Sequence, residues 1–81
     1  MDVDTDKIDE AVLALLFLTR VGEKPFAAAW KGHDWDALNR LHEKGYLGNP
    51  VSKNKSVAFT EEGMAKAEEL FWKLFGKSPR T

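Results

Sequence analysis

Cysteine is absent from this 81-residue sequence, and so are a strong excess of one charge sign and a long apolar run. Without cysteine the chain cannot form disulfides, and it cannot hold zinc or iron–sulfur clusters through thiolate ligands. The longest apolar stretch, Ala11 to Leu18, is too short to span a bilayer, and no basic segment precedes it as in a signal peptide. We therefore expect a cytoplasmic protein that does not associate with membranes.

The charge balance is close to neutral, with 12 Lys and Arg residues against 13 Asp and Glu residues and a net charge of −1. This balance lacks the basic excess that is typical of an obligate nucleic-acid-binding protein. Acidic side chains are concentrated in the first ten residues, namely Asp2, Asp4, Asp6, Asp9 and Glu10. Nucleic-acid binding, if present, must therefore use a local basic surface.

The residue sets that enzymes need are not assembled in the sequence. The nearest approach to a metal site is His33, Asp34, Asp36 and His42, whose spacing matches no zinc signature. Asp34 is also expected to cap a helix, and His42 falls on the apolar side of that helix. The sequence implies no Ser–His–Asp arrangement and no glycine-rich phosphate loop. We expect no enzymatic activity, no metal and no cofactor.

The length indicates one domain over residues 1–81, with a frayed end at about residues 76–81. A chain of this size buries only about 60–65% of its unfolded surface. Three Trp and five Phe residues must therefore supply much of the packing, or a second copy of the chain must contribute.

The first helix is predicted over residues 5–20, with Thr5 as N-cap, Asp6 and Asp9 in its first turn, and Gly22 as its end. Its second half is apolar on most sides, so more than one side must be buried. The principal apolar stripe at helical spacing is Ile8, Val12, Leu15 and Thr19.

Residues 26–30 (Phe-Ala-Ala-Ala-Trp) are predicted to form a short strand with Phe26, Ala28 and Trp30 on one face. A short helix is the alternative for residues 25–31, because alanine favours helices. We expect Trp30 and Trp35 to face inward and pack in the core, although each could instead stack on nucleic-acid bases.

A second helix is predicted over residues 35–44, between the N-cap Asp34 and the terminating Gly45. A β-hairpin follows, with strands over residues 46–51 and 56–59 and a polar tip at residues 52–55. Thr60 is the expected N-cap of the last helix. The predicted inner face of that helix consists of Met64, Ala67, Phe71 and Leu74.

Two local patterns resemble winged-helix regulators such as the MarR and PadR families over residues 34–75. They are Leu38-x-x-Leu41-x-x-x-Gly45-Tyr46-Leu47, a helix that turns directly into a strand, and Phe59-Thr60-Glu61-Glu62-Gly63, a strand that caps a helix. The resemblance implies an α+β, winged-helix-like fold in the order helix–strand–helix–β-hairpin (wing)–helix. Only about a dozen residues separate the first helix from Trp35, so the helix-turn-helix is expected to be abbreviated.

Over nearly its whole length the chain also resembles a family of small bacterial proteins that is defined only as a domain of unknown function. The segments that carry this resemblance are Asp4-Thr5-Asp6-Lys7-Ile8-Asp9, Ala29-Trp30-Lys31-Gly32, Asp34-Trp35-Asp36-Ala37-Leu38, Arg40-Leu41-His42-Glu43-Lys44-Gly45 and Lys55-Ser56-Val57. This resemblance supports the fold and implies no activity.

The candidate nucleic-acid-binding residues lie at the wing and on the second helix: Lys31, Arg40, Lys44, Lys53, Asn54 and Lys55. A basic wing tip can contact the phosphates of double-stranded DNA. Asp36 and Glu43 oppose this on the exposed face of the second helix, and Asp36 is spaced to pair with Arg40. The alternative is that Lys53 and Lys55 only keep an exposed hairpin soluble and unpaired.

The first and last helices carry more apolar side chains than one face of each can bury. The candidate dimer-interface residues are Leu13, Phe17, Leu18, Leu70, Trp72 and Phe75. Winged-helix proteins often dimerise through these helices, as the resemblance implies, and a large apolar patch on a monomer would be unusual. We therefore expect a homodimeric regulatory protein, either a DNA-binding transcriptional regulator or a protein–protein interaction (adaptor) module without DNA binding.

Overall fold

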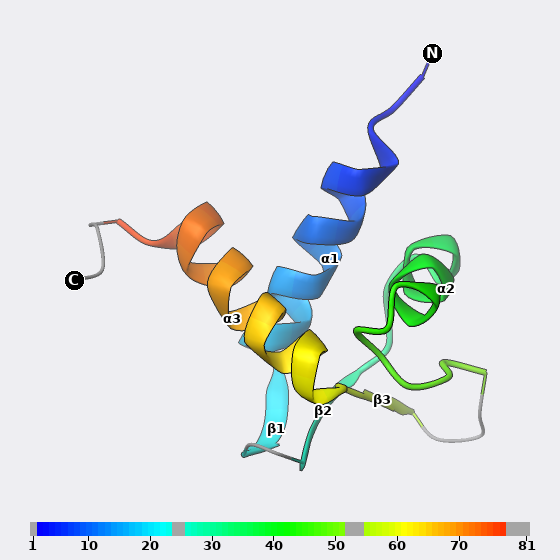
Figure 1. Cartoon of the computed structure of the whole chain (residues 1–81), viewed down its shortest axis with the longest axis vertical. Helices are drawn as coiled ribbons and strands as arrows, with labels where there is room; N and C mark the ends of the chain where they lie inside the picture. The colour runs from blue at the N-terminus through cyan, green and yellow to red at the C-terminus, as the bar shows by residue number, and fades with distance from the viewer. Residues whose placement is uncertain (1, 24–25, 52–54, 78–81) are drawn as a thin grey trace.

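A computed structural model describes residues 2–23, 26–51 and 55–77, which form a small α+β fold (Figure 1). The elements in chain order are α1 (Thr5–Leu18), β1 (Arg20–Glu23), β2 (Phe26–Trp30), α2 (Trp35–Glu43), β3 (Ser56–Ala58) and α3 (Glu61–Phe75). The strands form one antiparallel sheet in the order β1-β2-β3. The expected α+β class is confirmed.

Each helix begins at a side-chain cap. The predicted caps of α2 and α3 are confirmed: the Asp34 carboxylate accepts a hydrogen bond from Ala37 N at 3.1 Å, and the Thr60 hydroxyl accepts one from Gly63 N at 2.9 Å. The predicted cap of α1 is wrong by one residue, because the Asp4 carboxylate accepts from Lys7 N. Each cap satisfies a backbone N–H that has no partner within its helix.

The predicted end of α1 is wrong, because the helix stops at Leu18 and the chain turns directly into β1. Gly22, the expected terminator, lies inside β1 with a φ of 94°. The Arg20 guanidinium donates to the carbonyl of Phe17 at 3.0 Å and lies 3.9 Å from the centre of the Phe17 ring. This contact occupies one of the carbonyls at the helix end, which normally lack partners.

The predicted short strand over residues 26–30 is confirmed as β2, which occupies the centre of the sheet. The predicted first strand of the hairpin is wrong for most of residues 46–51. It is reduced to one bridge between Leu47 and Phe59, extended by a hydrogen bond from Gly48 N to the Ala58 carbonyl. The returning strand, β3, pairs mainly with β2.

The two faces of β2 differ in the size of their side chains. Ala27 and Ala29 are buried and face the helices, whereas Trp30 on the opposite face is 63% exposed. The predicted core positions of Trp30 and of Trp35, which is 50% exposed, are therefore wrong. The alternation of side chains between the two faces of β2 was predicted correctly, but the face that turns inward was not. The inward face carries alanines because α1 packs directly against β2, and their small side chains permit this close approach.

The core lies between α1, α2, α3 and the inner face of the sheet. Figure 1 shows α3 crossing α1, with α2 beside α1 and the strands at one end. The buried side of α1 contains Asp9, Leu13 and Leu16, so the predicted stripe is wrong at Leu15 and Thr19, which are exposed. On α3, Met64 and Ala67 are buried as predicted, but Leu74 is exposed. None of the helices in the described ranges is long and apolar enough to cross a membrane.

Candidate nucleic-acid interface

A carboxylate within the core organises the charges of α2. The Asp9 side chain on α1 is 1% exposed, and it accepts hydrogen bonds from Nε and Nη2 of Arg40 at 2.8–3.0 Å. Lys44 Nζ donates to the same carboxylate at 3.0 Å and lies 3.4 Å from Asp6. These contacts join α1 to α2 through one fork-shaped guanidinium and one ammonium.

This network fixes the charge state of its members. Burial alone would raise the pKa of Asp9, but the hydrogen bonds from Arg40 and Lys44 outweigh it and hold that pKa below its ordinary value. The hydrogen bond to Asp9 raises the pKa of Lys44 despite its partial desolvation. Asp9, Arg40 and Lys44 are therefore all ionised at neutral pH.

Asp9 was not predicted to be the partner of Arg40. The predicted position of Asp9 was the first helical turn, and the predicted partner of Arg40 was Asp36, which instead acts on Arg40 through its charge. A signal was present, since Asp9, Leu13 and Leu16 follow helical spacing and form one face. An acidic residue in a buried helical stripe requires a cationic partner.

The candidate nucleic-acid-binding residues therefore separate into two groups. Arg40 and Lys44 are bound to Asp9, whereas the backbones of Lys31 and Lys55 pair at the base of the hairpin, where Lys31 N donates to the Lys55 carbonyl at 3.0 Å. The candidates Lys53 and Asn54 lie outside the described residues.

Lys31 is fixed against the turn that follows α2. Its Nζ donates to the Pro50 carbonyl at 2.7 Å and lies 5.6 Å from the centre of the Trp35 ring. A lysine over an aromatic ring gains a favourable interaction with the negative face of the ring. Lys31 and Trp35 therefore pack together beside the hairpin, and Lys55 is exposed.

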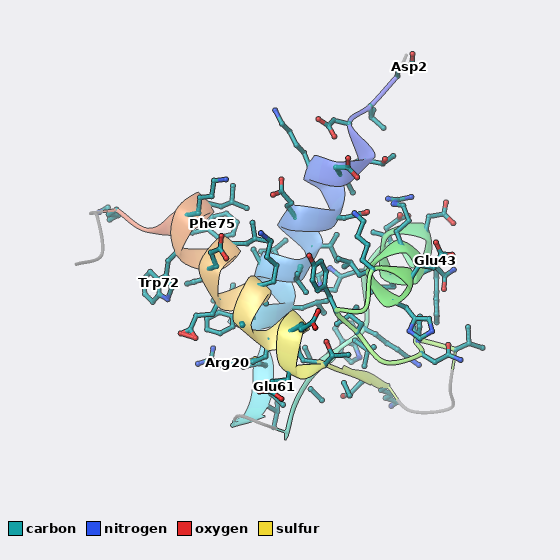
Figure 2. The ribbon with its side chains drawn as sticks, in the orientation of Figure 1. Asp2, Arg20, Glu43, Glu61, Trp72 and Phe75 are labelled. Atoms are coloured by element: carbon teal, nitrogen blue, oxygen red, sulfur yellow. The ribbon has the colours of Figure 1, made fainter. Side chains whose placement is uncertain are left out.

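The candidate dimer-interface residues also separate into two groups. Leu13, Phe17 and Leu70 are between 1% and 5% exposed and pack inside the protomer. Leu18 is 58% exposed, Trp72 42% and Phe75 49%. Figure 2 shows Trp72 and Phe75 on the part of α3 that extends away from α2. We call Leu18, Trp72, Leu74 and Phe75 the terminal apolar surface.

Aromatic contacts hold the end of α3 against α1. The Phe71 ring centre lies 5.3 Å from that of Phe17, 5.2 Å from that of Trp72 and 5.6 Å from that of Phe75. These distances are typical of favourable aromatic pairs. The α3 residues of the terminal apolar surface, Trp72, Leu74 and Phe75, are therefore carried on a helix end that packs against α1.

Two of the histidine and carboxylate candidates for a metal site have structural contacts instead. The Asp34 carboxylate caps α2, and His42 Nδ1 lies 3.0 Å from the Leu47 carbonyl. Across the described ranges, no three His, Cys, Asp or Glu side chains gather closely enough to hold a metal ion.

Comparison with known proteins places the chain in a family. The chain belongs to the family described as Domain of unknown function (DUF6429), whose model matches residues 4–77. It is 53% identical over 75 residues to the uncharacterized protein y4hR of Sinorhizobium fredii (strain NBRC 101917 / NGR234), covering 93% of this chain and 97% of that protein. No solved structure matches the chain significantly.

Proposed function

For this member of the DUF6429 family, we propose a small, cytoplasmic, homodimeric regulatory protein with a winged-helix-like fold and no catalytic activity of its own. In this proposal the hairpin between Leu47 and Phe59 is a wing that binds the phosphates of double-stranded DNA. The observation that carries the proposal is the backbone pairing of Lys31 with Lys55, which places two lysine residues at the base of the polar segment containing Lys53 and Asn54.

The element order supports a winged helix with an abbreviated helix-turn-helix. A strand, a helix and a hairpin follow α1, and α3 closes the fold. In a complete helix-turn-helix, one helix braces the recognition helix against DNA. Here the described residues between α1 and α2 form β1 and β2, and α1 holds α2 through Asp9, Arg40 and Lys44.

The charge distribution favours the hairpin over α2 as the DNA contact. Arg40 and Lys44 are paired with Asp9, and Lys44 also with Asp6, while Asp36 and Glu43 are exposed on α2. Carboxylates facing a phosphate backbone are unfavourable, whereas each lysine that contacts a phosphate releases a counterion. We therefore expect phosphate contacts from the wing and little base reading by α2.

Fluorescence anisotropy with a labelled DNA duplex tests this function, at about 50 and 200 mM salt. The wild-type protein should bind, and its affinity should fall steeply between the two salt concentrations. The double variant Lys53→Glu/Lys55→Glu should lose binding. The control Lys73→Glu/Lys77→Glu makes the same change of charge at the other end of the molecule and should retain it.

Two results would contradict duplex binding through the wing. One is the absence of binding at the lower salt concentration by protein whose fold has been verified by circular dichroism. The other is an equal loss in the two double variants, since only the net charge would then matter.

The terminal apolar surface supports the homodimer. Apolar patches of this kind on small proteins commonly mark contact sites. Size-exclusion chromatography with light scattering should give twice the monomer mass for the wild-type protein. The variant Trp72→Ser/Phe75→Ser should be monomeric, whereas Val51→Ser, which replaces another exposed apolar side chain, should remain dimeric.

The alternative function is a protein–protein interaction (adaptor) module without DNA binding. The same terminal apolar surface favours it, because a different protein could cover Trp72 and Phe75 in place of a second copy. A monomeric wild-type protein that binds no duplex would refute the homodimeric DNA-binding function and leave this alternative.

A further inference from the structure

The outer face of the sheet, opposite the helices, contains an open hollow of about 500 Å³. Its floor is formed by paired residues with very small side chains, since Ala28 lies opposite Ala58, and Gly48 donates to the Ala58 carbonyl. Within the described ranges the lining residues are Ala28, Gly48, Asn49, Lys55, Ser56, Val57 and Ala58. Side chains of one carbon or none leave space above the sheet for a flat molecule.

Trp30 lies on this same face beside the hollow. It pairs with Ser56, and the side chains of directly paired residues in an antiparallel sheet lie on the same face. A Cβ atom on Gly32 would lie 2.5 Å from the Trp30 ring, so glycine allows the ring to lie directly over the backbone. The ring is thus supported from one side, while 63% of the residue remains exposed.

The chemistry around the hollow is polar and positive. Lys55, Asn49 and Ser56 are among its lining residues, and none of the lining residues that the structure describes carries a carboxylate. The two acids at the start of α2 have other partners: Asp34 caps α2 by accepting from Ala37 N, and both Asp34 and Asp36 act electrostatically on Arg40. A cationic, hydrogen-bonding hollow beside an exposed indole matches an anion that carries a planar ring.

We propose that this outer face is a binding site for an unpaired base of single-stranded DNA. The base stacks on Trp30 above the small residues of β2 and β3, and Lys55 contacts an adjoining phosphate. Flat sheets with exposed aromatic rings bind single strands in this way, and stacking tolerates every base because each has a π face.

This site goes beyond the proposed duplex contact, with which it shares Lys55. The choice of DNA over RNA rests on the proposed function, whereas the stacking site itself does not. Together, the two contacts would favour DNA in which paired and unpaired segments meet.

The test measures the anisotropy of labelled oligo(dT), oligo(U) and a blunt duplex, together with the protein's tryptophan fluorescence. Oligo(dT) should bind the wild-type protein and quench part of that fluorescence. Trp30→Ala should weaken oligo(dT) binding between about five- and 150-fold, the range expected for loss of one stacked base. Trp30→Phe should recover part of the affinity, and Val3→Ala, which shortens an apolar side chain 64% exposed ahead of α1, should bind normally.

A second variant tests the hollow independently of the indole. Ala58→Glu places a bulky negative group on the floor while its backbone pairing with Ala28 is retained. It should abolish oligo(dT) binding without changing the thermal unfolding midpoint by more than a few degrees, since Ala58 is exposed.

The results separate this inference from the proposed function. Duplex binding that depends on Lys53 and Lys55, with oligo(dT) binding unaffected by Trp30→Ala, would overturn the stacking site and leave the proposed function standing. Oligo(dT) binding that depends on Trp30 without duplex binding would support the site and refute the proposed function. Tighter binding of oligo(U) than of oligo(dT) would overturn the choice of DNA.

Discussion

Replacement of Asp9 by asparagine should destabilise the protein strongly, although it changes the shape of the side chain very little. Asparagine can accept a hydrogen bond, but it carries no charge to balance the two cations. Arg40 Nη2 and Lys44 Nζ now lie 2.8 and 3.0 Å from the Asp9 carboxylate oxygens. Without that carboxylate, two like charges remain close together at the edge of the core.

The expected cost follows from the burial of the three groups. Removal of one partner from a buried ion pair typically costs about 3–5 kcal/mol, because the other charge is left uncompensated. The side chains of Arg40 and Lys44 are 30% and 37% exposed, so water restores part of their solvation. We therefore expect Asp9→Asn to lower the free energy of unfolding by about 2–3 kcal/mol. The total for a chain of this length is about 4–12 kcal/mol.

Urea denaturation followed by circular dichroism measures this loss through the unfolding midpoint. The matched control is Asp6→Asn, which removes a carboxylate that is 85% exposed and 3.4 Å from the same lysine. An exposed pair of this kind should cost less than about 0.5 kcal/mol. Equal midpoints for Asp9→Asn and Asp6→Asn would refute the conclusion that the buried carboxylate holds α1 to α2.

The same contacts give the stability a defined pH dependence. Because the folded-state pKa of Asp9 is lowered, its contribution is complete above the unfolded value of about 3.9 and is lost as the pH falls through the folded value. The pKa of Lys44 is raised, so its contribution is present below about 10.4 and is lost as the pH rises through the folded value. Urea midpoints measured across pH should show both losses, and the acid loss should be much smaller in Asp9→Asn. Gly63→Ala should prevent stable folding, because the added Cβ would overlap the carbonyl of Tyr46. Gly48→Ala is the control, since a Cβ there makes only ordinary van der Waals contacts, and it should fold. Circular dichroism would distinguish the two variants. Trp30→Ala should lower the free energy of unfolding by less than about 1 kcal/mol in a urea melt, since the indole is mostly exposed.

Local signals in the sequence were sufficient to predict where α2 and α3 begin and where α2 ends. Asp34 and Thr60 are strong capping residues, and Gly45 adopts a φ of 85° that favours glycine after a helix. These features act within a few residues of the chain, so they can be recognised without knowing its tertiary contacts. The short strand β2 was predicted for the same reason.

Features that depend on distant contacts were predicted less well. β1 contains Arg20, Gly22 and Glu23 in four residues, and its structure depends on pairing with β2. The exposure of Trp30 depends on the close approach of α1 to Ala27 and Ala29, which the alternation alone cannot reveal. The Asp9–Arg40 pair joins residues 31 positions apart, and with the Lys44–Asp9 pair it engages two of the six predicted DNA-contact residues inside the protein.

The junction between the hairpin and α3 determines how the wing is placed relative to the terminal apolar surface. Thr60 N donates a hydrogen bond to the Tyr46 carbonyl, and the Thr60 hydroxyl donates one to the Gly45 carbonyl. Gly63 packs against the backbone of Tyr46. The first turn of α3 is thus fixed to the base of the hairpin, while its last turn carries Trp72 and Phe75. One rigid helix therefore sets both the distance and the rotational phase between the wing and a partner bound at the far end. Because each residue inserted into an α-helix adds about 1.5 Å and about 100°, a one-residue insertion within α3 would re-aim Trp72 and Phe75 relative to the wing and would also move Phe71 away from Phe17. The length of α3 is therefore constrained by the core and by the two surfaces together.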